Sequence, residues 1–333
     1  STQGYSSAAS DVYKRQIRNR MGLTTSRSLG VNATYDWKRV KLRSNIQYVG
    51  TDRLEDSRTT VDNYIRKDKS MTRSTNNSRT ENNNLVANAF LEWKMDSVTT
   101  LIFRPQYRFS ANGRENKGFQ EGWGNDVLLN EKVSSGSNHN SQYNVTMMLQ
   151  LSRKLSQKGR NVALKVDYGT NSSSNDRKNL STTHYFKNDR EDSKNQKIED
   201  DIDGYNYRVQ LVYVEPLLWM HHLQLRYSYQ YKVNNSDRFV YDWNEDLGEF
   251  TPDYDESASN QFENQYSNHL LNLAVRTSRK KYNYNVGVDL EPQKSVSHSL
   301  LSDPPEEPLK RSVLNFSPTV NFRYKFSKRT RLQ

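Results

Sequence analysis

The sequence contains no cysteine and few hydrophobic residues. Of its 333 residues none is Cys, 14 are Gly and 33% are hydrophobic. Adding the glycines gives about 37%, below the ~45–50% that is typical of soluble domains. The lack of cysteine excludes a disulfide scaffold, a thiolate metal site and a cysteine nucleophile. No window approaches the ~18 consecutive apolar residues of a membrane-spanning helix, so a helical membrane protein is excluded as well.

Aromatic residues are nevertheless abundant. The chain has 21 Tyr, 11 Phe and 5 Trp, whereas disordered segments have few aromatics. A polar composition alone would suggest disorder, but these side chains need an ordered place to pack. The sequence therefore indicates a folded chain in which the few apolar side chains, many of them aromatic, occupy ordered positions.

Apolar residues recur at every second position. Between Leu29 and Trp37 the odd positions are Leu29, Val31, Ala33, Tyr35 and Trp37, and polar residues separate most of them. A period of two is typical of a strand with one apolar face. The apolar spacing of a helix is absent, and β-branched and aromatic residues, which favour strands, dominate the stripes.

The same alternation predicts eleven strands, and a twelfth begins near Arg329. The predicted ranges are 28–37, 40–50, 84–94, 98–110, 142–153, 161–170, 204–215, 220–233, 268–277, 281–291 and 312–326.

Short and long connections alternate strictly between these strands. Short turns centre near residues 38, 96, 156, 218, 279 and 327. The long polar connections are expected at 51–83, 111–141, 171–203, 234–267 and 292–311. Loops longer than ~12–15 residues are uncommon in compact domains. An antiparallel up-and-down meander places all of them at one end, and closure into a barrel removes unpaired strand edges.

Charged residues on the polar face favour a membrane barrel over a soluble sheet. The candidate lumen-lining residues are Arg104, Arg108, Arg226, Arg276 and Arg323. Such charges are hydrated in a wet lumen and costly in a dry core. Strands of about ten residues, apolar outside and polar inside, are typical of outer-membrane barrels. A soluble β-sandwich and a β-propeller are the alternatives, although two strands in about 60 residues do not fit a propeller blade.

The connection after the eighth predicted strand is both acidic and aromatic. Carboxylates offer hard oxygen ligands to a cation, and rings offer stacking surfaces to a sugar. Its candidate ligand contacts are Asp242, Trp243, Asp246, Asp253, Tyr254 and Asp255. The spacing does not match an EF-hand, and a mobile, solvated loop is the favoured interpretation of this segment.

No motif points to catalysis, a metal or a cofactor. The six histidines have no ligand spacing, and neither a G-x-S-x-G elbow nor a P-loop is present. An outer-membrane lipase would need a triad that we cannot assemble. The net charge of +11 is spread along the chain without a nucleic-acid-binding motif. Basic residues at the short turns suit anionic lipid head groups, or simply solvated turns.

Three stretches resemble a known family. They run from Met21 to Asp56, from Leu91 to Tyr107 and from Leu314 to Lys328. They are similar to the outer-membrane β-barrel family of Bacteroidetes-type bacteria that is related to TonB-dependent receptors, over about residues 20–333. The resemblance implies a barrel of about 22 strands, often preceded by a plug. It also implies outer-membrane lipid as surroundings, an energy-coupling periplasmic partner and an extracellular ligand.

We therefore expect a fragment of a barrel wall, without plug or closing strands, and hence an open, curved sheet of about 11–12 strands. Residues 1–16 fit no strand pattern and resemble translated adaptor sequence, so the barrel domain is expected over residues 17–333. The favoured function is binding or import of a nutrient at the surface of a Gram-negative cell. The alternative is a non-transporting outer-membrane scaffold or surface-binding protein.

Overall fold

A computed structural model of the chain describes residues 12–65, 68–217, 221–279, 281–301, 307–325 and 331–332. The described residues form β-strands and turns. The strands are β1 (Val12–Trp37), β2 (Val40–Ile65), β3 (Asp68–Lys94), β4 (Thr99–Gly124), β5 (Val127–Lys154), β6 (Asn161–Tyr185), β7 (Arg190–Pro216), β8 (His221–Asn244), β9 (Glu249–Phe250), β10 (Asn260–Ser278), β11 (Tyr282–Ser299), β12 (Leu309–Lys325) and β13 (Arg331–Leu332). Within these ranges no helix is long and apolar enough to cross a membrane.

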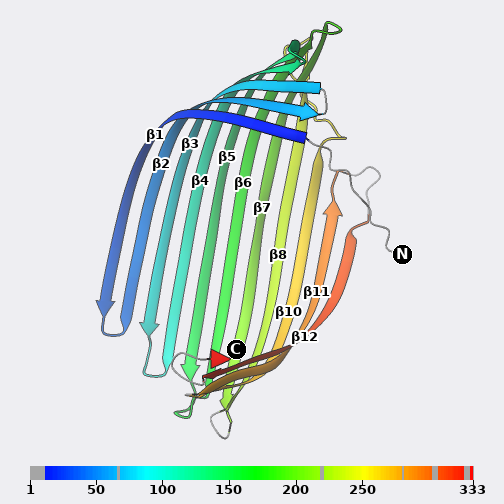
Figure 1. Cartoon of the computed structure of the whole chain (residues 1–333). Helices are drawn as coiled ribbons and strands as arrows, with labels where there is room; N and C mark the ends of the chain where they lie inside the picture. The colour runs from blue at the N-terminus through cyan, green and yellow to red at the C-terminus, as the bar shows by residue number, and fades with distance from the viewer. Residues whose placement is uncertain are drawn as a thin grey trace.

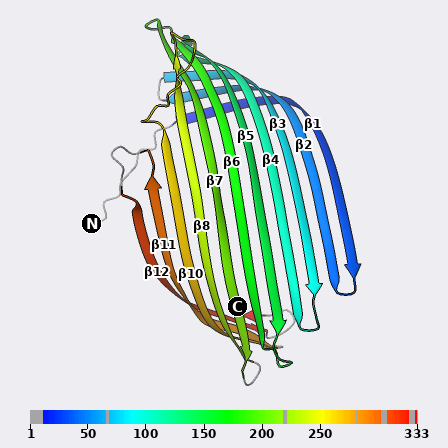
Figure 2. The same cartoon turned by 180° about the vertical axis from the view of Figure 1, so that it is seen from behind.

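The strands pair in chain order as one antiparallel meander, which confirms the predicted fold class. The order is β1 to β8, then β10 to β13, and β9 pairs only with β8. The eleven predicted strands correspond to β1–β8 and β10–β12, and β13 lies where the twelfth was expected. The sheet curves into an open trough with β1 and β12 along its two sides (Figures 1 and 2). Among the described strands β1 pairs only with β2, so the sheet is not closed.

The predicted long loops are wrong for most of their length. Strands β2 to β7 contain 25–28 residues each, at least twice the predicted length, and β8 contains 24 where 14 were predicted. The polar stretches 51–83, 111–141 and 171–203 continue the ladders up to tight turns such as Asn125-Asp126, where both residues have positive φ. Period two is lost in these stretches because both sheet faces lie in water, so neither face needs apolar residues. The stretch 234–267 keeps a loop at 251–259, and residues 302–306 of the stretch 292–311 lie outside the described part of the chain.

The first strand also begins earlier than expected. Val12 pairs with Ile65 at the start of β1. The sequence placed residues 12–16 outside the predicted strands. Their backbone pairing with β2 shows that they belong to the sheet. Residues 1–11 lie outside the described part of the chain. Whether the segment is native stays untested.

Apolar side chains from successive strands meet on one face of the sheet. Directly paired residues share a face, and one such row crosses seven strands. It consists of Leu151, Leu164, Leu211, Tyr227, Leu271, Leu290 and Phe316. No other element of the described residues covers this face, and Leu211 remains 46% exposed in mid-sheet. Among the described residues only Ile198, Val214, Val240 and Ala274 are buried hydrophobics, so the chain has no large dry core.

The apolar stripe occupies about a third of each long strand. In β5 it runs from Tyr143 to Leu151, nine residues, which is about the length of a tilted strand that crosses the membrane in an outer-membrane barrel. The whole of β5 has 28 residues. The remaining, polar part extends beyond that stripe, on the side away from the short turns.

The short turn between β3 and β4 is held by one carboxylate. Asp96 Oδ1 accepts hydrogen bonds from the backbone N–H groups of Val98 (2.7 Å) and Thr99 (2.6 Å). Its Oδ2 accepts a third from the Thr99 hydroxyl (3.0 Å). These bonds, with that from Val98 first, lower the pKa of Asp96 below its ordinary value of 3.8.

We expect Asp96→Ala to lower the denaturant midpoint of unfolding at neutral pH. A native-state pKa below the unfolded-state value contributes stability above the unfolded pKa, which is lost as the pH falls through the native pKa. The difference between wild type and Asp96→Ala should therefore shrink below about pH 4. Urea unfolding at several pH values checks this, with Ser97→Ala in the same turn as control. An equal difference at pH 3 and pH 7 would contradict it.

Candidate functional site

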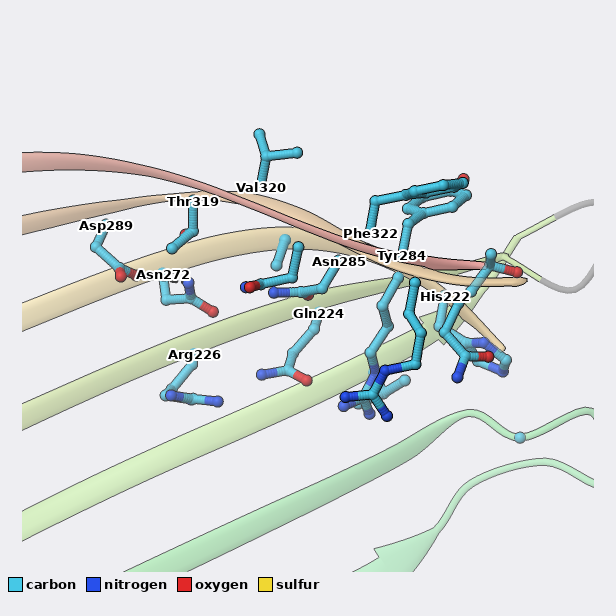
Figure 3. Close-up of a pocket in the computed structure, with 18 of the residues that line it drawn as sticks. His222, Gln224, Arg226, Asn272, Tyr284, Asn285, Asp289, Thr319, Val320 and Phe322 are labelled. Atoms are coloured by element: carbon cyan, nitrogen blue, oxygen red, sulfur yellow. Dashed lines mark hydrogen bonds between the residues drawn. The ribbon is translucent and has the colours of Figure 1, made fainter. Parts of the chain in front are cut away.

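The polar, concave side of the sheet contains a hollow formed by β8, β10, β11 and β12. It has a volume of about 970 Å³ and lies toward the short turns, next to Gly159 and His222. Figure 3 shows Gln224, Arg226, Asn272 and Asn285 on one side of the ribbons, whereas Val320 points to the other. We refer to this 970 Å³ hollow as the arginine hollow.

Three cross-strand rows build the arginine hollow. The first contains His222, Arg276, Asn285 and Asn321, the second Gln224, Ala274, Gly287 and Thr319, and the third Arg226, Asn272, Asp289 and Ser317. The second row places Ala274 and Gly287, which have almost no side chain, between two rows of long polar residues. The hollow exists because this middle row is small.

Gly287 is required by close packing of β10 against β11. A Cβ atom at this position would lie 2.8 Å from the Cβ of Ala274 and 2.9 Å from the carbonyl oxygen of Leu273. Both distances are shorter than van der Waals contact, and neither neighbour is the end of a flexible side chain. The floor of the arginine hollow therefore depends on glycine.

The electrostatic balance of the arginine hollow is positive. Arg226, Arg276 and Arg323 line it, and Asp289 is the only carboxylate among its described lining residues. The Asp289 carboxylate accepts a hydrogen bond of 2.5 Å from Asn272 Nδ2. The Nε of Arg226 is buried without a hydrogen-bond partner. Buried polar atoms are normally paired, so an unpaired donor here is unusual.

Polar side chains are also buried here more than elsewhere. Gln224, Asn272 and Thr277 have exposed fractions of 6%, 9% and 3%, and Ser228 on the same strand as Gln224 is equally buried. Amides and guanidinium groups supply hydrogen-bond donors that suit a solute with carboxylate, carbonyl or phosphate oxygens. The arrangement can bind such a solute but contains no nucleophile–base pair that we can identify.

The five predicted lumen arginines lie on the polar face but in separate places. Arg226, Arg276 and Arg323 come together in the arginine hollow. Arg108 lines a smaller hollow of about 450 Å³ together with Gln142 and Asn171. The guanidinium carbon of Arg104 lies 5.0 Å from the centre of the Phe90 ring. Their function in a lumen stays a prediction.

The predicted outer-loop residues are largely engaged with one another or with neighbouring strands. The Trp243 and Phe250 rings pack edge to face at 5.1 Å, and Tyr254 packs on Phe239 at 5.1 Å. The backbone oxygen of Asp242 accepts from the Thr251 N–H (2.9 Å), the Asp246 N–H donates to Asn244 Oδ1 (3.0 Å), and the backbone oxygen of Asp253 accepts from the Thr251 hydroxyl (2.8 Å).

Asp255 closes this loop onto the end of its strand. Its carboxylate accepts hydrogen bonds from the hydroxyl (2.7 Å) and the N–H (2.8 Å) of Ser257, which lower its pKa. Its own N–H donates to the carbonyl of Val240 (2.7 Å). Within the described ranges no three His, Asp or Glu side chains gather as a possible metal site. The geometry therefore offers no ready-made cation site in this loop, and contacts to a ligand stay a prediction.

Sequence reasoning missed a second polar surface, farther from the short turns. Asn82, Asn112, Asn140 and Asn175 form one cross-strand row across β3 to β6. These residues fell within the expected loops, so no register was assigned to them. The signal was the recurrence of asparagine at every second position, as in Asn82 and Asn84 or Asn138 and Asn140.

Comparison with models of protein families gives one match. Residues 153–333, just over half of the chain, match the model described as "Outer membrane protein beta-barrel family". The matched segment contains the whole arginine hollow. A search of curated proteins finds no match.

Proposed function

Because the chain belongs to the outer membrane protein β-barrel family, we propose that it forms part of the wall of an outer-membrane barrel of the TonB-dependent-receptor type. Its neighbours would be outer-membrane lipid on the apolar face and water on the concave face. In this proposal the barrel binds or imports a nutrient at the cell surface. Energy coupling would come from a periplasmic partner that engages parts of the protein outside this chain.

The arginine hollow is the observation that carries this proposal. A wall that only anchors loops has no need of a 970 Å³ hollow with a positive lining at the periplasmic end of its concave face. Binding sites are typically concave and contain a few convergent polar groups. The guanidinium groups of Arg226, Arg276 and Arg323 along the hollow support binding of an anionic or carbonyl-rich group there.

A second function, a non-transporting surface scaffold, is favoured by the length of the strands. In β3 to β7 more than half of each strand lies beyond the apolar stripe. Such a tall polar wall could serve as a platform for partners at the surface without any transport. Uptake measurements separate the two functions.

We expect cells carrying the intact gene to import at least one anionic nutrient that cells lacking it do not. In the double variant Arg226→Gln and Arg276→Gln, uptake should fall at least tenfold because both guanidinium groups are lost. The matched control, Arg190→Gln with Arg311→Gln, removes the same charge outside the arginine hollow. Immunoblots of outer-membrane fractions verify equal amounts of each protein.

Equal uptake of every tested nutrient with and without the gene would overturn transport and favour the scaffold. Wild-type uptake by the Arg226 and Arg276 double variant would exclude the arginine hollow as the solute site. Fractionation of the intact protein as soluble without detergent would contradict the membrane placement.

A further inference from the structure

The concave face of the sheet becomes rich in amide side chains beyond the apolar stripe, on the side away from the short turns. In β3 to β6, five successive cross-strand rows face the concave side. Ten of their twenty positions are amides, namely Asn76, Asn82, Asn84, Asn112, Asn116, Asn138, Asn140, Gln142, Asn175 and Asn179. Most of the others are serine, threonine or glycine, and only Arg114 and Arg177 are charged. We call this surface the amide wall.

The opposite face of the same segments has a different composition. Its four intervening rows hold sixteen positions, of which only Asn77 and Asn83 are amides. Six are charged, namely Arg79, Glu81, Glu115, Lys117, Asp176 and Lys178. Both faces lie in water, so solubility alone would not sort neutral amides to one side and charges to the other. The asymmetry indicates that the concave side is adapted to something that touches it.

The hydrogen bonds of the amide wall leave part of its capacity unused. The Ser110 hydroxyl donates to Asn84 Oδ1 (2.8 Å) and the Ser173 hydroxyl donates to Asn140 Oδ1 (3.2 Å). The Oδ1 atom of Asn138 is buried without any partner. Each amide offers two donors and one acceptor with two lone pairs, so the wall presents donors and acceptors side by side. Its charged members are Arg114 and Arg177, and Arg177 is paired with Asp200 of the next strand (2.5 Å).

A hollow and an apolar platform adjoin the amide wall. The hollow, of about 520 Å³, is lined by neutral residues such as Asn138, Asn140 and Asn175, and by the ion pair of Arg238 with Asp200 (3.7 Å). Along the row of Ser173, the next strands contribute Ile202 and then, beyond Ser236, Phe262. Ile202 and Phe262 are 38% and 37% exposed, although they lie on the polar side of the sheet. Neutral hydrogen-bonding groups beside an exposed ring suit a ligand that is polar at its edges and apolar on its faces.

We propose that the amide wall binds a neutral, polyhydroxylated chain, that is, an oligosaccharide. Vicinal hydroxyls both donate and accept, which matches paired amides, whereas a charged ligand would exchange its hydration for a surface made mostly of neutral groups. The row from Asn82 to Asn175 spans about 14 Å at ~4.8 Å between strands, enough for several sugar rings. This proposal rests on the proposed function in one respect, namely that the amide wall faces the outside of the cell. It adds the class of ligand that the amide wall contacts.

The test measures binding of neutral hexasaccharides to the chain folded in detergent micelles. Maltohexaose, laminarihexaose and a mannohexaose are titrated by calorimetry, and oligogalacturonate of equal length is the charged comparison. Purified smooth lipopolysaccharide is a further probe, which tells whether the glycan comes from the membrane or from solution. Folding of every variant is verified by circular dichroism and by heat-modifiable gel migration.

We expect at least one neutral hexasaccharide to bind and the oligogalacturonate to bind at least tenfold more weakly. Asn112→Ala with Asn140→Ala should weaken that binding at least tenfold, since two adjacent hydrogen-bonding groups are lost. The matched control, Asn77→Ala with Asn83→Ala, removes two amides from the opposite face of β3 and should bind as wild type.

Absence of binding by all neutral probes to the folded chain would overturn the proposal. So would equal losses in the two double variants, or a preference for the charged probe. Uptake that depends on Arg226 and Arg276 would survive any of these results, so failure of the amide wall is distinguishable from failure of the proposed function.

Discussion

Replacing Met147 by arginine is expected to destabilise the folded protein in a bilayer by about 2–4 kcal/mol, because the residue lies at the middle of the lipid-facing stripe. Met147 is flanked on that face by Pro105 and Tyr168 and is 40% exposed. A charge there must leave water for hydrocarbon. Equilibrium unfolding in urea from short-chain lipid vesicles, followed by tryptophan fluorescence, gives the free energy of unfolding.

The neighbouring residue provides the matched control. Thr146 lies on the opposite, concave face between Gln106 and Gly169. Thr146→Arg adds the same charge one position away, where it stays hydrated, and should change the free energy of unfolding by less than about 1 kcal/mol. If Thr146→Arg were the more damaging change, the assignment of the two faces would be reversed. If both were harmless, the sheet would not lie in lipid.

Adding one methyl group at Gly287 is expected to cost about 1–3 kcal/mol, the usual cost of overpacking. The new Cβ would come within 3 Å of the Ala274 Cβ and the Leu273 carbonyl oxygen, so β10 and β11 would have to separate. Gly287→Ala should lower the urea midpoint and also fill part of the floor of the arginine hollow.

Gly169→Ala tests whether the cost arises from this packing or from loss of any glycine. A Cβ at Gly169 would meet Asn206 Oδ1 at 2.8 Å, but that atom is the end of a side chain and can rotate away. Alanine is otherwise favoured over glycine within a strand by roughly 0.5–1 kcal/mol. Gly169→Ala should therefore be neutral or stabilising. Destabilisation of similar size at both positions would contradict the packing argument.

The sequence by itself determined the class of the fold, because the lipid band imposes a strict rule on the residues that cross it. Every second residue from Tyr143 to Leu151 must be apolar, while its neighbours remain in water. This rule repeats in each strand, so eleven strands, their order and their two faces could be predicted from residues alone. The basic character of the polar face could be predicted for the same reason, since Arg226 and Arg276 occupy polar-face positions of recognisable strands.

The tertiary structure alone decided where the strands end and which polar residues meet. Beyond the apolar stripe both faces of the sheet are in contact with water, so apolar residues do not alternate with polar ones. The sequence around Asn82 is therefore compatible with either a strand or a loop. The register between strands then fixes Asn112 beside Asn140, and Arg226 beside Asn272. Such pairings depend on hydrogen bonds between residues far apart in the chain, and one sequence does not encode them as a local pattern. Both the arginine hollow and the amide wall are products of that register.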